Sequence, residues 1–164
     1  MIMGITLKSA GKIENYILSN EYMRNCAIMK KFELIEHTAD MGLAAYGKDL
    51  AEAFANAAYG MFSIIAELDG VKEAEQRQVE IKEDDMEGLL FEWLNSLLYY
   101  FDVETLIFKR FDIMEFGEGR LKAVCYGEKY DASRHRLKTG IKSATYHMLE
   151  VDPAKNMVQV IFDV

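Results

Sequence analysis

Proline and cysteine are scarce in this chain of 164 residues, which has one proline, Pro153, and two cysteines, Cys26 and Cys125. A sequence with so little proline, and with 51% hydrophobic and 12% aromatic residues, is typical of a packed globular protein. The two cysteines lie far apart and fit no metal-ligand spacing, so we expect free thiols in a reducing compartment. The sequence also has no apolar run of membrane-spanning length and no signal-peptide core. We therefore expect a cytoplasmic protein without a membrane partner.

Basic residues are outnumbered: 19 lysines and arginines stand against 27 aspartates and glutamates, which gives a net charge of -8. Domains that bind nucleic acid strongly usually carry a basic face that displaces counterions from phosphates. We therefore expect no strong direct nucleic-acid binding, and only an indirect link to RNA. One stretch, residues 133–140 (SRHRLKTG), is locally basic. It is either a solvated loop or a contact for an anion or an acidic partner.

The length is enough for one domain with a sizeable core and short for two. Residues 1–28 show no clean hydrophobic period, and Met29 directly precedes the first convincing strand. We therefore expect residues 1–28 to be an N-terminal extension, a poorly ordered segment or the product of an upstream start codon. The domain proper is predicted to be residues 29–164.

Two helices are indicated by hydrophobic periodicity. The first begins with Asp49 as N-cap, has Glu52 three residues later, and should end before Gly70. The second, over residues 86–101, has the strongest periodicity of the chain. Burying side chains of this size contributes about 1.5–3 kcal/mol each, so this helix is expected to lie on a sheet.

Two features of the second helix have alternative interpretations. The acidic run at residues 83–85 is a metal cluster or, preferably, the helix start with Asp84 as N-cap, because negative charge suits a helix N-terminus. Phe91, Tyr99 and Tyr100 lie off the apolar stripe. They either extend the core or form an aromatic patch for a partner.

Short stretches with the alternation or composition of strands occupy most of the remaining domain. They are residues 31–36, 43–46, 78–82, 106–116, 121–126, 141–151 and 157–164. A bend or bulge is expected at Lys109 and Arg110. In the strand that begins at residue 141, alternation predicts that Thr145, His147 and Leu149 share one face.

Candidate metal ligands lie at Asp40 and Asp163. Residues 36–42 (EHTADMG) form a polar turn between two strands, where the Asp40 carboxylate and backbone carbonyls suit hard cations such as Ca²⁺ or Mg²⁺. Asp163, at the end of the last strand, offers a second hard oxygen ligand. Two alternatives stay open: Asp40 forms an Asx-turn while Gly42 supplies an unusual backbone angle, and Asp163 simply reaches solvent.

No catalytic constellation stands out. The three histidines are scattered, and the sequence shows no Ser-His-Asp order and no phosphate-cradling glycine loop. Cys125 is interpreted as a small packed side chain, because no activating base is evident. A metal-dependent hydrolase that used the two carboxylates would also need a general base, and the sequence supplies no convincing pair.

Four segments carry a likeness to a known family: residues 32–42 (FELIEHTADMG), 91–99 (FEWLNSLLY), 141–147 (IKSATYH) and 160–164 (VIFDV). Together, in this order, they resemble the archease family. The likeness covers residues 29–164, leaves residues 1–28 outside the family pattern, and differs at Ser143-Ala144 from a more usual Ala-Val. It implies an α+β fold: a single two-layer domain with a mixed, mostly antiparallel sheet and two helices packed on one face.

The resemblance implies an accessory protein and not an enzyme. Archeases assist RtcB-family RNA ligases in tRNA splicing, where they promote transfer of guanylate from GTP onto the ligase's active-site histidine and so allow multiple turnover. The alternative is a chaperone of a tRNA cytosine-5 methyltransferase. The resemblance also implies a divalent cation held by Asp40, Asp163 and the backbone carbonyl of Val164, with Ca²⁺ expected and Mg²⁺ or Mn²⁺ left open.

Overall fold

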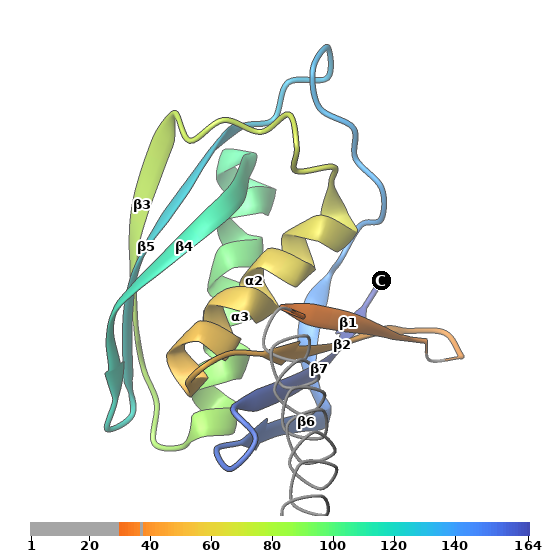
Figure 1. The fold of residues 1–164 in the computed structure, drawn as a ribbon. Helices are drawn as coiled ribbons and strands as arrows, with labels where there is room; N and C mark the ends of the chain where they lie inside the picture. The colour runs from red at the N-terminus through yellow and green to blue at the C-terminus, as the bar shows by residue number, and fades with distance from the viewer. Residues whose placement is uncertain (1–29, 37) are drawn as a thin grey trace, which may run out of the picture. The chain divides into compact units, whose positions relative to one another are not determined.

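The computed structural model describes residues 30–36 and 38–164 (Figure 1). Lys31–Val164 make up one compact unit. The prediction for residues 1–28, like Cys26 and His37, lies outside the described residues. Within the described part of the chain, no helix is both long enough and apolar enough to span a membrane.

Four strands form one antiparallel sheet in the order β1-β2-β7-β6. Their bounds are β1 Phe32–Glu36, β2 Met41–Tyr46, β6 Ser143–Asp152 and β7 Met157–Asp163. Strands β1 and β2 pair with each other, as do β6 and β7. The β2–β7 ladder therefore joins the first strand pair of the domain to the last.

The remaining strands form a second antiparallel sheet in the order β3-β5-β4. Their bounds are β3 Glu75–Lys82, β4 Leu106–Gly117 and β5 Arg120–Lys129. The β4–β5 register shifts between Phe108 and Arg110, which confirms the irregularity predicted there.

The two helices, α2 Leu50–Ile65 and α3 Met86–Glu104, lie between the two sheets (Figure 1). Helix α2 contacts β2 of one sheet and β4 of the other, and α3 contacts β6 as well as all three strands of the second sheet. The α+β class with two helices is therefore confirmed. The strands, however, are divided between two antiparallel sheets, where the family resemblance implies a single mixed, mostly antiparallel sheet.

The buried residues of α2 explain why two sheets are needed. Ala53, Ala57 and Phe54 are fully buried, and so are Ala58 and Phe62. These positions extend beyond one narrow stripe of the helix, so a sheet on one side alone would leave part of the apolar surface in water.

The centre of the core lies at the contact of α2 with α3. Trp93 is fully buried, and its indole Nε1 donates a hydrogen bond to the backbone oxygen of Phe54 at 3.0 Å. Phe62 meets Phe108 edge to face, with ring centroids 5.7 Å apart. The helix with the strongest periodicity thus supplies the centre of the core, as predicted.

Aspartate side chains cap the start of both helices. Asp49 accepts a hydrogen bond from the Glu52 amide at 2.8 Å, which confirms the predicted N-cap of α2. In α3 the cap is Asp85, which accepts from the Gly88 amide at 2.6 Å, so the prediction of Asp84 is wrong by one residue. Adjacent aspartates are equally good caps, and the backbone conformation at the helix start decides between them.

Strand β6 departs from simple alternation. Thr145 pairs with Ile161, but the next paired residue of β6 is Glu150, so four β6 residues stand where β7 has one. The predicted shared face does not continue through this bulge: His147 is exposed, whereas Leu149 packs against the core. A bulge adds residues on one strand and so breaks the alternation of faces.

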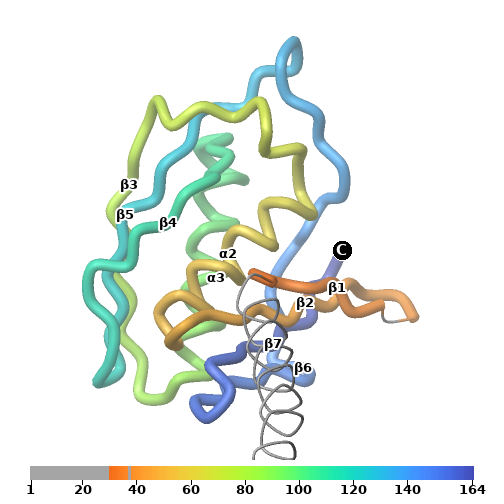
Figure 2. Tube along the Cα trace, in the orientation of Figure 1, coloured from red at the N-terminus to blue at the C-terminus, as the bar shows by residue number. Residues whose placement is uncertain are grey.

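An extended segment, residues 130–142, connects the second sheet to the first and crosses the end of α2 (Figure 2). Leu137 forms an isolated bridge with Ala66, and the Lys138 amide donates to the backbone oxygen of Ile65 at 2.7 Å. These bonds satisfy backbone groups at the helix C-terminus.

Candidate functional site

The β2–β7 register brings the two predicted carboxylate ligands together. Its last pair is Met41 with Phe162, so continuing the register by one residue sets Asp40 opposite Asp163. Opposed positions in an antiparallel ladder are about 5 Å apart between Cβ atoms. We refer to Asp40 and Asp163 as the Asp40–Asp163 pair; Val164 follows it directly in the chain.

The Asp40–Asp163 pair is open to solvent. Asp163 is exposed and Asp40 is partly exposed. Neither carboxylate forms an ion pair or a hydrogen bond with another residue in the described ranges, so the Asx-turn alternative for Asp40 is not what the structure has there. The backbone oxygen of Asp163 accepts a hydrogen bond from the Lys142 amide at 2.8 Å. The described part of the chain therefore supplies no counter-charge to either carboxylate.

The donor set at this pair fits a hard divalent cation. It consists of two carboxylates, to which the family resemblance adds the backbone carbonyl of Val164, and such oxygen ligands suit Ca²⁺, Mg²⁺ and Mn²⁺ better than the softer transition metals. Among residues 30–36 and 38–164, no group of three or more His, Cys, Asp or Glu side chains could hold a metal ion. Side chains at the pair thus supply two ligands, and further ligands would be backbone oxygens, water or a partner's groups.

Gly42 allows the strands to pack closely beside this pair. It pairs with Ile35 on β1 and with Ile161 on β7. A Cβ added to Gly42 would lie 2.9 Å from side-chain atoms of both isoleucines. Gly42 is not among the described glycines with a positive φ, so the predicted unusual backbone angle is wrong. Glycine is needed at position 42 because a larger side chain would clash with Ile35 and Ile161.

A second polar cluster closes the end of β5. Glu128 is 8% exposed and accepts hydrogen bonds from the Lys72 amide at 2.8 Å and from His135 Nε2 at 2.9 Å. Arg134 forms an ion pair with the same carboxylate at 2.6 Å. The Asp131 amide donates to His135 Nδ1 at 2.9 Å, so the imidazole hydrogen lies on Nε2, toward Glu128. We call Glu128, Arg134 and His135 the Glu128 cluster.

The Glu128 cluster is structural. Burial alone raises the pKa of Glu128, but the hydrogen bonds from the Lys72 amide, His135 and Arg134 outweigh burial and lower the pKa to about 2. The basic stretch at residues 133–140 therefore ties the connecting segment to β5 through its charges. Apart from the buried His135 and the partly buried Thr139, the residues of this stretch are exposed, as the solvated-loop alternative predicts.

Cys125 and His135 have side chains with catalytic potential, but both take part in the packing or hydrogen bonding of the fold. Cys125 is fully buried, and burial together with the charge of Asp112 raises the pKa of its thiol. This confirms the interpretation of Cys125 as a packed side chain. His135 is held on both ring nitrogens by the Glu128 cluster and the Asp131 amide. Neither is free to act as a nucleophile or base at the Asp40–Asp163 pair.

Sequence reasoning missed Tyr146. Its ring stacks on Phe91, with centroids 4.1 Å apart and planes 15° apart, and it is 60% exposed. Of the other aromatic residues off the α3 stripe, Tyr100 packs against the core, whereas Tyr99 is 60% exposed. No signal in the sequence marks this position, because Tyr146 and His147 are both exposed only through the bulge that breaks the alternation of β6.

Comparison with known proteins points to one family. The model of the archease protein family matches residues 32–164. The protein archease of Sulfurisphaera tokodaii is 39% identical over 135 residues, which cover 82% of this chain and 97% of that protein. Protein archease of Pyrococcus abyssi is 38% identical over 142 residues, which cover 83% of this chain and 100% of that protein.

Solved structures agree with this grouping. The solution structure of Methanobacterium thermoautotrophicum protein 1598 is similar with a TM-score of 0.70 and 34% identity, covering 83% of this chain and 100% of the other. A crystal structure from Thermotoga maritima, described as an archease and possible chaperone, has a TM-score of 0.52 at 21% identity. It covers 80% of this chain and 96% of the other, and is similar in fold.

Proposed function

Because the chain belongs to the archease family, we propose that it is a cytoplasmic accessory protein of an RtcB-family RNA ligase in tRNA splicing. On this proposal it promotes guanylylation and multiple turnover of the ligase through a divalent cation, for which Ca²⁺ is the first candidate and Mg²⁺ or Mn²⁺ the others. The observation that carries the proposal is the β2–β7 register, which sets Asp40 opposite Asp163.

The residues that would hold the cation are Asp40, Asp163 and Val164. The two side-chain carboxylates contribute negative charge that no described side chain neutralises, and Val164 would contribute a backbone oxygen. When bound, the cation would supply positive charge that screens phosphate oxygens during nucleotidyl transfer. The chain itself positions that charge on the end of a sheet whose ladders on both sides of β7 fix the backbone of Asp163.

The protein surface suits a basic, RNA-handling partner. A net charge of -8 favours association with a positively charged protein and disfavours direct contact with RNA phosphates. On this proposal the role is that of an activator and not of an enzyme, which is consistent with the burial of Cys125 and the hydrogen bonding of His135 within the fold. The nucleophile for guanylate is the ligase's own histidine.

GTP-dependent guanylylation of the cognate ligase tests this proposal. Wild-type protein should stimulate guanylylation, and Asp40→Asn and Asp163→Asn should each reduce stimulation to near the level without the protein. Asp69→Asn is a matched control, because Asp69 is an exposed carboxylate in a loop away from the strands of the first sheet. Full stimulation by both folded variants would overturn the proposed role of the pair.

A second candidate is a chaperone of a tRNA cytosine-5 methyltransferase. Exposed apolar side chains favour it, among them Leu34 at 53% and Met148 at 53% exposure, because chaperones act by covering apolar surface. The Thermotoga maritima relative is itself described as a possible chaperone. Protection of the methyltransferase from aggregation that survives Asp40→Asn and Asp163→Asn, without any effect on the ligase, would favour this candidate.

A further inference from the structure

The bulge of β6 presents an exposed tyrosine and methionine at the side of α3. Tyr146 is 60% exposed and Met148 is 53% exposed. Met148 adopts a left-handed backbone conformation with a φ of 53°, which is unfavourable for a residue with a long side chain. A hydrogen bond from Gln159 Nε2 to the backbone oxygen of Met148, at 3.1 Å, supports this conformation. The bulge therefore has a defined shape.

Helix α3 fixes the orientation of Tyr146. The Tyr146 ring stacks on Phe91 at 4.1 Å, and Asn95, one helical turn further on, holds β6 through Ala144. Asn95 Oδ1 accepts from the Ala144 amide at 2.9 Å, and Asn95 Nδ2 donates to the Ala144 oxygen at 3.4 Å. Tyrosine held in one orientation loses little conformational entropy on binding, and Tyr and Met are enriched at protein interfaces.

Three carboxylates lie close enough to Tyr146 to act on it through their charges. Partial burial of the ring, and the charges of Glu83, Asp85 and Glu92, raise the pKa of Tyr146. None of these three carboxylates forms an ion pair within residues 30–36 and 38–164, although Asp85 caps α3. Carboxylates on the second sheet, by contrast, do form ion pairs: Glu80 on β3, for example, pairs with Arg120 at 2.9 Å. The acidic charge around Tyr146 is thus available to an outside cation.

We propose that Phe91, Tyr146 and Met148, rimmed by Glu83 and Glu92, form a docking surface for a basic protein surface that carries an exposed aliphatic or aromatic side chain. We call it the α3–β6 patch. An aromatic and methionine centre with an uncompensated acidic rim matches a partner with the opposite charge around an apolar anchor. RNA is disfavoured as the occupant because its phosphates would be repelled by the rim.

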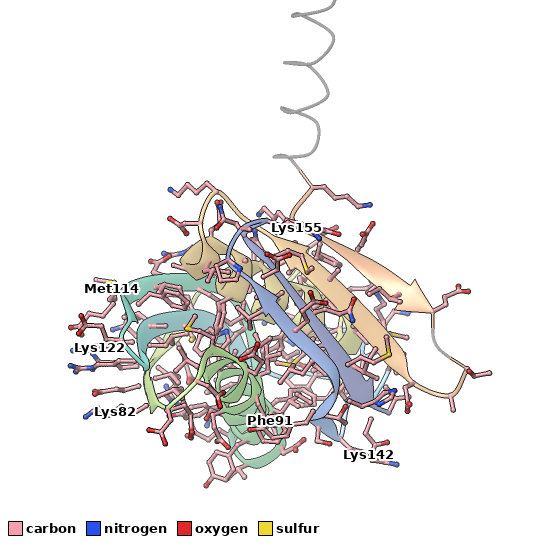
Figure 3. All side chains as sticks on the ribbon, turned by 90° about the horizontal axis from the view of Figure 1, so that it is seen from below. Lys82, Phe91, Met114, Lys122, Lys142 and Lys155 are labelled. Carbon is pink, nitrogen blue, oxygen red and sulfur yellow. The ribbon has the colours of Figure 1, made fainter. Side chains whose placement is uncertain are left out.

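The α3–β6 patch and the Asp40–Asp163 pair belong to one compact unit. Ser143, three residues before Tyr146, pairs with Asp163, and Asn95 bonds the next residue of β6, Ala144. In Figure 3, Phe91 on α3 and Lys142, the residue before β6, both lie toward the lower edge of the view. The identity of the partner as the RNA ligase rests on the proposed function. On that basis the patch is a second contact that orients the Asp40–Asp163 pair toward the ligase.

Affinity of the full-length protein for the cognate ligase, measured by biolayer interferometry, tests the patch. Tyr146→Ser/Met148→Ser should weaken the complex at least about tenfold, as truncation of central interface anchors does. Glu83→Lys/Glu92→Lys should also weaken it, while leaving the apolar centre intact. Met114→Ser is the matched control, because Met114 is 63% exposed on β4 of the other sheet, and it should change the affinity less than about twofold. Calcium binding should be unchanged in all of these variants.

The outcomes separate this inference from the proposed function. If the wild type binds and stimulates the ligase and the patch variants bind equally well, the patch is not the docking surface and the proposed function stands. If the wild type neither binds nor stimulates the ligase, the proposed function fails and the patch proposal fails with it. If sedimentation shows a wild-type dimer that Tyr146→Ser/Met148→Ser converts to a monomer, a second copy occupies the patch and the proposal is overturned.

Discussion

Each sheet has a carboxylate at or near the end of a central strand, and the two carboxylates differ in their burial and in their bonding partners. Near the end of β5, Glu128 is buried and bound by Arg134, His135 and the Lys72 amide. At the end of β7, Asp163 is exposed beside Asp40, and neither has a side-chain partner in the described part of the chain.

The difference distinguishes a carboxylate that stabilises the fold from carboxylates that can attract a cation from outside the chain. A buried carboxylate is tolerated only when the same chain supplies donors and counter-charge, so Glu128 belongs to the fold. Two adjacent carboxylates without a counter-charge add nothing to the stability of the fold, since like charges repel. Their charge remains available to a cation from outside the chain.

Removing Glu128 should have the largest effect on stability. Glu128→Ala leaves the Nε2–H of the buried His135 and the Lys72 amide without their acceptor, and each buried donor left unsatisfied costs about 1–3 kcal/mol. We expect the free energy of unfolding, measured with urea, to fall by about 3 kcal/mol. Glu67→Ala is the control, because it breaks an exposed pair with Arg136 and should cost less than about 1 kcal/mol. Equal losses would contradict the distinction between the two kinds of charge.

Acid should weaken the fold through the same cluster. The folded protein lowers the pKa of Glu128 from 4.5 to about 2, so the unfolded state binds the proton more readily. The stability that Glu128 contributes is therefore complete above about pH 4.5 and is lost as the pH falls through about 2. Urea unfolding over this interval should show a shallower pH dependence for Glu128→Gln than for the wild type. Parallel curves would count against the role assigned to Glu128.

Calcium should stabilise the protein through the Asp40–Asp163 pair alone. Binding to the folded state adds about 2.7 kcal/mol at a free ion concentration 100-fold above the Kd. Thermal unfolding in Ca²⁺ and in EDTA should show this gain for the wild type and for Glu128→Gln, and should show none for Asp163→Asn. A gain that survives Asp163→Asn would mean that the ion binds elsewhere.

The smallest effect is expected for the pair itself in the absence of divalent cations. Asp40→Asn and Asp163→Asn should each change the free energy of unfolding in EDTA by less than about 0.5 kcal/mol. The change should be a slight gain, because each substitution removes one of two like charges. A loss above about 1 kcal/mol would show that these carboxylates support the fold.

Features set by local chemistry could be predicted from the sequence. The Asp49 cap of α2 and the apolar face of α3 depend on residues within a few positions of each other, and both are confirmed. The cap of α3 was assigned to Asp84 in place of Asp85, because two neighbouring aspartates offer the same chemistry.

Features set by distant contacts could not be predicted in this way. The pairing of Glu128 with His135 depends on how the connecting segment folds back, and the bulge at Tyr146 depends on the register with β7. Division of the strands between two sheets follows from burial of α2 on more than one side. The sequence offers Asp40 and Asp163 as candidate ligands and the family resemblance implies that they act together, but only the β2–β7 register gives their proximity a physical basis.

Calcium titration by isothermal calorimetry tests most directly whether Asp40 and Asp163 hold a cation together. The wild type and the control Asp69→Asn should bind Ca²⁺ at one site per chain. Asp40→Asn and Asp163→Asn should each lose that binding while remaining folded. Unchanged binding in either variant would contradict the assignment of the Asp40–Asp163 pair as a cation site.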